Sequence, residues 1–257
     1  MPRRVHPGEQ NPVDQARWHG LLRHVLGAAL LALPAAWLLA GALGLGPVYL
    51  AAVGAAVVAG ALLLLGLKAP FSRAHPHATF GPANRVTLAR AVGVGLLAGL
   101  AFEPQTDGRA WSAIALATLS AVLDGVDGRL ARRSGLASRF GARFDMETDA
   151  LMILVLAILA WRWDRAGAWV LCAGLMRYGF VLAARPWPWL AAELAPSRRR
   201  QAVCVVQVVG LILALLPWLS GGQAALVAAL SLAALCYSFA LDVRDLARRR
   251  TTEGFAR

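Results

Sequence analysis

The chain has 257 residues, of which 58% are hydrophobic and only 16% are charged. This composition excludes a disordered chain, a collagen and a disulfide scaffold. Because soluble domains carry roughly 25% charged residues, it also favours a membrane protein. The net charge of +12 comes without a groove-reading motif, so we expect no nucleic acid among the partners.

Apolar runs of about 18 residues or more recur along the chain, and each is long enough to cross a bilayer as a helix. The polar segment 1–20 comes first, and we expect a cytoplasmic tail there and no removable signal peptide. Eight predicted spans follow, at 21–45, 47–67, 85–102, 110–126, 145–162, 166–184, 201–218 and 222–242. The fold class is therefore predicted to be all-α, a polytopic integral membrane helix bundle.

These spans fall into segments with different characters. The first two form a tight hairpin around Gly46-Pro47 and, with a proline-rich amphipathic hinge, make up a module over 21–81. The remaining six spans occupy 82–243, and a basic cytoplasmic tail over 244–257 closes the chain.

Basic residues are distributed unevenly between the two sides of these spans. With the N-terminus in the cytoplasm, 22 of the 26 Lys and Arg residues fall on the cytoplasmic side. Only Arg109, Arg162 and Arg165 fall on the opposite side, and Arg177 lies inside a span. Because cytoplasmic loops of membrane proteins are rich in basic residues, we expect a multi-pass protein of the cell (inner) membrane with both termini in the cytoplasm.

Acidic residues cluster where the fourth predicted span ends and the fifth begins. Asp124 and Asp127 are three residues apart, and Asp145 and Asp149 are four apart, so each pair shares one face of its helix. Glu147 is out of phase with the second pair. Two helices joined by a short connection run antiparallel, so we expect the two carboxylate pairs to converge at one membrane depth.

Four carboxylates near the hydrocarbon boundary repel one another unless cations neutralise them. Mg²⁺ prefers oxygen ligands and leaves positions free for substrate phosphates. Two such ions, Mg²⁺ or Mn²⁺, would clamp a diphosphate and polarise its phosphorus. The alternative is that Asp145 only caps a helix and that the other carboxylates balance nearby arginines.

The spacing of the acidic residues belongs to a longer pattern. From Asp124 to Asp149 the chain reads D-x2-D-G-x2-A-R-x8-G-x3-D-x3-D. This signature resembles that of the CDP-alcohol phosphotransferase (CDP-alcohol phosphatidyltransferase) family, integral membrane enzymes of phospholipid synthesis. The segment from Pro82 to Arg90 resembles the P-N-x-x-T-x-x-R opening of the family's first core helix, with one extra residue after the proline.

The resemblance covers about 82–243 and implies a six-helix core, to which the first module adds two N-terminal transmembrane helices. It implies transfer of a phosphatidyl group from a CDP-alcohol, expected to be CDP-diacylglycerol, to an acceptor hydroxyl with release of CMP. It also implies a homodimer among membrane lipids.

Individual residues take roles from the same resemblance. Those expected to ligate metal are Asp124, Asp127, Asp145 and Asp149. Asp149 is in addition the expected general base. The residues expected to bind the CDP-alcohol are Asn84, Thr87, Gly128, Ala131 and Arg132. Purely structural alternatives stay open. Asn84 and Thr87 could cap a helix, Gly128 and Ala131 could serve helix packing, and the charge of Arg132 could set the membrane topology. Gly141 is expected to permit the chain reversal between the two helices.

Residues that choose the acceptor are harder to identify. Arg177 lies within a span, where a charge must face a polar cavity or a structural partner. Arg198 opens a run of three arginines that suits either an anionic acceptor or a topology anchor. Relatives that use glycerophosphate carry a lysine directly after the last aspartate, where this chain has Ala150. The resemblance therefore argues against glycerol-3-phosphate as the acceptor.

Two functions of other classes compete with the enzyme. A polytopic transporter could use the aspartates as a cation site, but it predicts carboxylates near the bilayer midplane and repeated halves. A non-catalytic membrane scaffold could keep the fold, but it gives no reason for an intact set of four aspartates.

Overall fold

The computed structural model describes the backbone of residues 12–66, 79–134, 136, 138–192, 194 and 197–254. Side chains are described from residue 19 onward, except at 63–66, 127, 129, 131–134 and 250–254 within helices. Most of the predicted hinge and the ends of both predicted tails lie outside the described residues. Where the backbone is described, all regular structure is helical and strands are absent, which confirms the all-α class.

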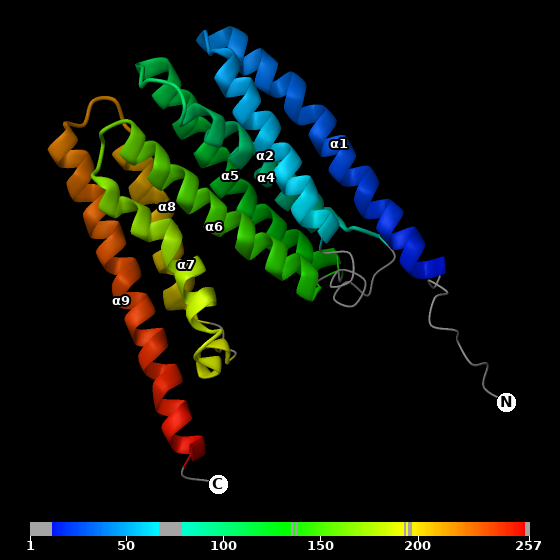
Figure 1. The fold of residues 1–257 in the computed structure, drawn as a ribbon, viewed down its shortest axis with the longest axis vertical. Coiled ribbons are helices and arrows are strands. Elements are labelled where there is room, and N and C mark those ends of the chain that lie inside the picture. The colour runs from blue at the N-terminus through cyan, green and yellow to red at the C-terminus, as the bar shows by residue number, and fades with distance from the viewer. Residues whose placement is uncertain are drawn as a thin grey trace. The chain divides into compact units, whose positions relative to one another are not determined.

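Eight α-helices make up the described part of the chain, and each overlaps one predicted span (Figure 1). They are α1 (Pro12–Leu43), α2 (Pro47–Gly66), α4 (Pro82–Leu100), α5 (Asp107–Ser134), α6 (Arg139–Arg162), α7 (Cys172–Ala183), α8 (Arg198–Ala214) and α9 (Gly221–Gly254). Two short 3-10 helices, η1 (Ala168–Leu171) and η2 (Pro188–Ala191), precede and follow α7.

Helices α5 and α6 are longer than the spans predicted from hydropathy. α5 runs on to Ser134, and α6 begins at Arg139, six residues before Asp145. Hydropathy misses these extensions because they carry charged residues. Asp124 and Asp145 therefore lie inside helices, and the alternative that Asp145 is a helix N-cap is wrong.

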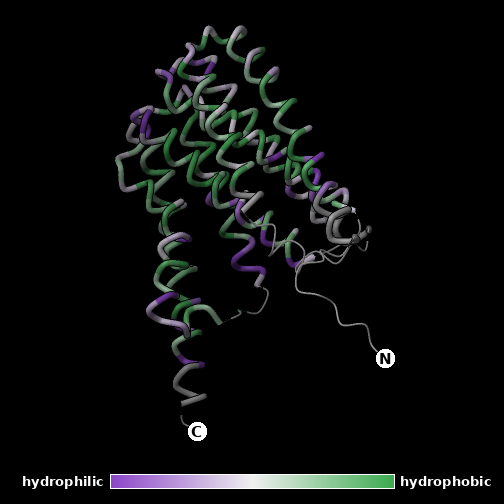
Figure 2. Tube along the Cα trace, turned by 45° about the vertical axis from the view of Figure 1, so that its right-hand side comes forward, coloured by the Kyte–Doolittle hydropathy of each residue, from purple (hydrophilic) through white to green (hydrophobic). Residues whose placement is uncertain are grey.

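In the part of the chain that the structure describes, three helices are long and apolar enough to cross a membrane, namely His19–Leu43, Asp107–Val126 and Gly221–Arg249. Two shorter apolar helices are Pro47–Leu62 and Ala168–Ala183. Apolar residues fill long stretches of the helices in Figure 2, with hydrophilic residues in bands between and beyond them. These spans support a membrane protein, while the full count of eight crossings stays a prediction.

The chain divides into two compact units that interleave along the sequence. One comprises Met1–Gly99 and Leu119–Thr148, and the other comprises Leu100–Thr118 and Asp149–Arg257. All three divisions fall within helices, one at the last residue of α4 and the other two inside α5 and α6.

The first unit opens with the predicted hairpin of α1 and α2. Gly44 has a φ of +57°, the left-handed conformation that favours glycine, and the Leu45 amide donates to the Ala40 carbonyl at 2.9 Å. Pro47 then starts α2 at a position where no backbone donor is needed. The hairpin around Gly46-Pro47 is confirmed.

Helix α2 packs closely on α4 where α4 has glycine. A Cβ built on Gly99 would lie 2.7 Å from the ring of Tyr49 and 2.8 Å from Cγ2 of Val53. One turn earlier, a Cβ on Gly95 would lie 3.8 Å from Ala56. Gly95 and Gly99, two small residues four positions apart, thus let α2 pack closely on α4, as in other close helix contacts in membranes.

A small apolar cluster completes the first unit near the start of α4. Its buried residues are Leu21, Val25, Phe80, Leu88 and Phe140, which come from α1, from α4, from α6 and from the segment just before α4, where Phe80 lies two residues before Pro82. This cluster holds the N-terminal ends of α4 and α6 against α1.

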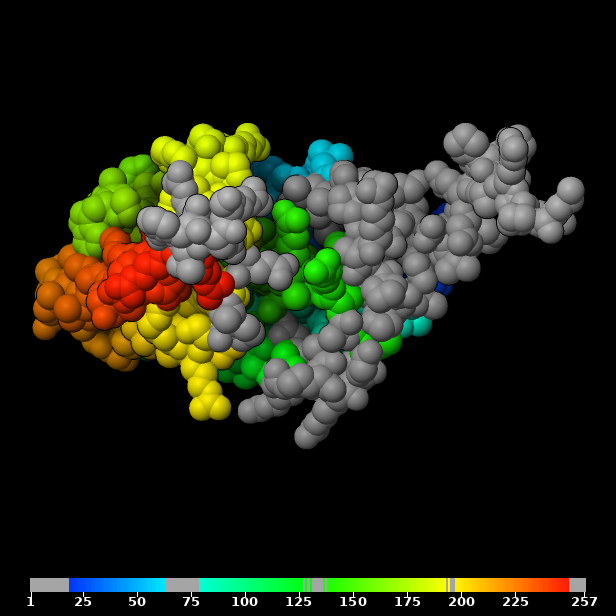
Figure 3. Space-filling view, turned by 90° about the horizontal axis from the view of Figure 1, so that it is seen from below, coloured from blue at the N-terminus to red at the C-terminus, as the bar shows by residue number. Residues whose placement is uncertain are grey.

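In the second unit, α8 and α9 pack side by side (Figure 1). A Cβ on Gly210 would lie 2.6 Å from Ser231, so glycine permits this contact. α9 has 34 residues and would extend about 51 Å at 1.5 Å per residue. Its C-terminal turns (red) face the viewer in Figure 3.

The three arginines predicted on the non-cytoplasmic side are all held by main-chain carbonyls in this second unit. Arg165, only 8% exposed, donates to the carbonyls of Ala214, Leu216 and Leu219 at 3.0, 2.7 and 2.8 Å. Arg162 donates to the Ala101 carbonyl at 3.1 Å. Arg109 donates to the Pro104 carbonyl at 2.9 Å and pairs with Glu103 at 3.4 Å.

Candidate active site

Three of the four signature aspartates converge. Oxygen atoms of Asp124, Asp145 and Asp149 all lie within 4.8 Å of one another. Asp124 projects from α5, and the other two project from α6, where they are one turn apart on a continuous helix. The side chains of Asp124 and Asp145 are 41% and 39% exposed, so water reaches both carboxylates.

The fourth aspartate of the signature is Asp127. Asp127 lies on α5 three residues after Asp124, but its side chain is outside the described residues. The helical spacing predicts that it shares the face of Asp124.

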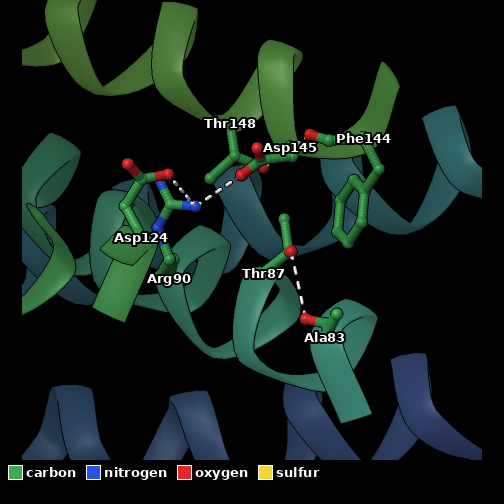
Figure 4. A network of polar contacts seen from close by, with 7 residues as sticks. All are labelled: Ala83, Thr87, Arg90, Asp124, Phe144, Asp145 and Thr148. Carbon is green, nitrogen blue, oxygen red and sulfur yellow. Dashed lines mark hydrogen bonds and ion pairs between the residues drawn. The ribbon is translucent and has the colours of Figure 1, made fainter. Parts of the chain in front are cut away.

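A buried arginine joins the two helices that carry the aspartates (Figure 4). Nη1 of Arg90, on α4, lies 2.6 Å from Oδ1 of Asp145 and 2.9 Å from Oδ1 of Asp124. The Arg90 side chain is only 2% exposed. One guanidinium nitrogen therefore bridges two predicted metal ligands from its buried side.

Arg90 was given no role at the site from the sequence, although its position carried a signal. Asn84, Thr87 and Arg90 follow one another at intervals of three residues on α4, which places them along one helix face. The resemblance includes Arg90 in the opening pattern of the first core helix, whereas the charge asymmetry alone explains it as a basic residue on the cytoplasmic side.

The two polar residues before Arg90 are buried and bonded to the backbone. Asn84 is 5% exposed, and its Nδ2 donates to the Phe80 carbonyl at 2.5 Å. Thr87 is 2% exposed, and its hydroxyl donates to the Ala83 carbonyl at 3.2 Å. Both bonds run from a side-chain donor to a carbonyl, so neither is the N-cap bond that the capping alternative requires.

Gly141 serves a different purpose from the one expected. It is the third residue of α6 and so does not make the chain reversal. A Cβ at this position would lie 2.6 Å from Oδ1 of Asn84. The absence of a side chain at Gly141 lets the Asn84 amide lie against α6.

The other predicted substrate-binding residues are only partly described. Gly128 is half-buried on α5. Ala131 and Arg132 lie on the same helix, but their side chains are outside the described residues. In the second unit, Arg177 is half-buried on α7 and Arg198 is exposed at the start of α8.

Arg199, the residue after Arg198, makes hydrogen bonds and an ion pair with α9. Arg199 donates through Nη1 to both the carbonyl and the hydroxyl of Ser238, each at 2.6 Å, and through Nη2 to Asp242 at 2.5 Å. Arg200 lies 3.5 Å from the same carboxylate. These contacts tie the start of α8 to α9 and account for the burial of Asp242.

The donor set at the aspartates fits a hard divalent cation. All of the converging atoms are carboxylate oxygens, the ligands that Mg²⁺ prefers. At Mg–O distances of about 2.1 Å, two ligands on one ion lie at most about 4.2 Å apart, close to the spacing of these oxygens. Asp124, Asp145 and Asp149 are therefore the described residues able to hold such an ion.

The family model described as CDP-alcohol phosphatidyltransferase matches residues 80–239, which is more than half of the chain. The match starts two residues before α4 and ends within α9, so it contains the aspartates and leaves α1 and α2 outside. No curated protein and no solved structure matches the chain.

Proposed function

We propose, from the premise that the chain belongs to the CDP-alcohol phosphatidyltransferase family, that it transfers a phosphatidyl group from CDP-diacylglycerol to the hydroxyl of a small acceptor and releases CMP. Members of this family are membrane enzymes that transfer phosphatidyl groups from CDP-alcohols, and they generally use a divalent metal. The donor lipid, the two metal ions and the residue roles are our proposal.

The observation that carries this proposal is the convergence of carboxylates from α5 and α6. Asp124, Asp145 and Asp149 bring oxygens within 4.8 Å of one another, in side chains that water reaches. Asp127 would add a fourth ligand from α5. Bound Mg²⁺ or Mn²⁺ would supply charge that neutralises the diphosphate and makes its phosphorus more electrophilic.

The proposed reaction is a displacement at the lipid-side phosphorus. The acceptor oxygen forms a bond to this phosphorus while the bond to the bridging oxygen of the diphosphate breaks, and that oxygen leaves as part of CMP. Asp149 accepts the proton of the acceptor hydroxyl, as a general base within hydrogen-bond reach would. The proposed cradle for the CDP portion consists of Asn84, Thr87, Gly128, Ala131 and Arg132.

The acceptor is proposed to be an alcohol other than glycerol-3-phosphate. Ala150 follows the last aspartate and is 6% exposed, so it offers neither charge nor a hydrogen bond to a phosphate. Arg177 and Arg198 stay as candidate acceptor contacts.

We also propose a homodimer in the cell inner membrane with both termini in the cytoplasm. The contacts of Arg109, Arg162 and Arg165 support this orientation, because carbonyls hold these charges for structural reasons. The remaining basic residues outside the spans then all lie on one side, as the positive-inside bias requires.

The proposal is tested by measuring CMP release from CDP-diacylglycerol and Mg²⁺ by purified protein, with a panel of polyols, amino alcohols and polyol phosphates as acceptors. At least one acceptor is expected to give acceptor-dependent CMP release that stops when the metal is chelated. If no acceptor releases CMP from a folded protein that still binds CDP, the scaffold is the better account.

A further inference from the structure

The bridging position of Arg90 has a consequence for the metal site, which rests on the function proposed above. Its Nη1 lies within 2.9 Å of both Asp124 Oδ1 and Asp145 Oδ1. Three carboxylates and this one guanidinium leave two negative charges among the described groups of the site. A positive charge already resides where a divalent cation is to bind.

Burial indicates that Arg90 stays in place when a metal ion arrives. Its side chain is 2% exposed, while those of Asp124 and Asp145 are 41% and 39% exposed. The guanidinium thus lies behind the carboxylates, and an ion from water approaches from in front. Removing Arg90 from these partners would break two close ion pairs of a buried guanidinium, which is strongly unfavourable.

A fixed guanidinium has two opposing effects on metal affinity. It draws Asp124 and Asp145 together, which favours binding by pre-organising the ligands. It also repels a divalent cation held by the same carboxylates, and this repulsion involves twice the charge of an ordinary like-charge pair at a distance of a few ångströms. At such a short distance in a partly buried site, we expect the repulsion to exceed the gain from pre-organisation.

We propose that Arg90 makes metal binding depend on the nucleotide substrate. With Arg90 present, the carboxylates alone hold a divalent ion weakly, and the negative charge of the diphosphate is needed to restore tight binding. Each ligand then raises the affinity for the other by the same factor, as linkage requires. Arg90 is a positioning residue in this account, because it acts through the metal ligands.

The test measures Mn²⁺ affinity by the electron paramagnetic resonance of free Mn²⁺, with and without saturating CDP, on full-length protein. Wild type is expected to bind Mn²⁺ about tenfold more tightly with CDP, within the range usual for coupled sites. Arg90→Gln is expected to raise the affinity without CDP about tenfold and to remove most of the coupling. Arg90→Lys keeps the charge and is expected to keep the coupling.

Arg85→Gln is the matched control, because it removes one positive charge from the exposed side of the same helix and is expected to behave as wild type. Weaker or unchanged Mn²⁺ binding in Arg90→Gln would overturn the proposal in favour of a purely orienting role. Equal Mn²⁺ affinity with and without CDP in wild type would overturn it even if the variant does not fold.

CMP release by the same wild-type preparation separates this inference from the proposed function. If the protein releases CMP but binds Mn²⁺ equally well with and without CDP, only the proposed role of Arg90 is wrong. If CDP raises the Mn²⁺ affinity but no CMP is released, the proposed activity is wrong and the proposed role of Arg90 is kept.

Discussion

Two buried arginines, one in each unit, are satisfied by different kinds of partner. Arg165 uses its donors on three main-chain carbonyls at the end of α8 and beyond it. Arg90 lies against two carboxylates that are about 40% exposed and keep oxygens available to solvent. The first arrangement completes backbone hydrogen bonding, whereas the second joins α4 to α5 and α6 through charged groups at the edge of the solvent. Arg90 therefore differs from Arg165 in having partners that are charged and reached by water.

The largest effect is expected at the aspartates, on activity and not on stability. Asp149→Asn removes the proposed base and one metal ligand, and we expect CMP release to fall by about a thousandfold, within the range for loss of a general base. The thermal unfolding temperature should change little, because Asp149 is half-exposed. An active Asp149→Asn enzyme would contradict the proposed proton transfer.

At the other arginine, the expected effect is on stability and not on activity. Arg165→Met leaves three carbonyls without their donor and should lower the free energy of unfolding by about 3 kcal/mol. Arg162→Met removes one such bond and should cost about 1 kcal/mol. Denaturant unfolding in detergent measures both values. If both variants lost the same free energy of unfolding, the number of carbonyl contacts would not determine the destabilisation.

The contact between α2 and α4 allows a comparison of two glycines that differ only in the space around them. Gly99→Ala places a Cβ 2.7 Å from the Tyr49 ring and should destabilise the protein by about 2 kcal/mol through overpacking. Gly93→Ala, on the same helix with open space around it, should be neutral or stabilising. Thermal unfolding of the two variants should show shifts of different size, and a matched pair of shifts would argue against close packing.

The smallest effect is expected where α6 contacts Asn84. Gly141→Ala pushes a Cβ to 2.6 Å from Oδ1 of Asn84 and should raise the KM for the CDP-alcohol about tenfold, or about 1.4 kcal/mol. Gly125→Ala, in open space on α5, is the control and should leave KM unchanged. An unchanged KM in Gly141→Ala would remove Asn84 from the proposed nucleotide site.

Sequence patterns anticipate much of this molecule because hydropathy and fixed spacing report local features. The eight helices follow from apolar runs, and the hairpin follows from Gly46-Pro47. The converging aspartates Asp124, Asp145 and Asp149 follow from helical spacing together with the family signature. Each of these needs only residues near in the chain or a motif of known spacing.

Other features depend on contacts between distant residues, which no local pattern contains. The charged ends of α5 and α6 extend helices beyond the apolar runs, so hydropathy places their boundaries too early or too late. The bridge from Arg90 to Asp145 joins residues 55 positions apart. The contact of Gly141 with Asn84 joins two helices, so the glycine was assigned to a turn instead.

Binding of a divalent ion by the aspartates is the central claim, and Mn²⁺ titration of wild type beside Asp145→Asn tests it most directly. In the presence of CDP, wild type should bind Mn²⁺ at the protein, and the variant should bind it at least about tenfold more weakly, because it loses one charged ligand. Equal Mn²⁺ affinity in the two folded proteins would contradict the account, since the converging oxygens would then hold no ion.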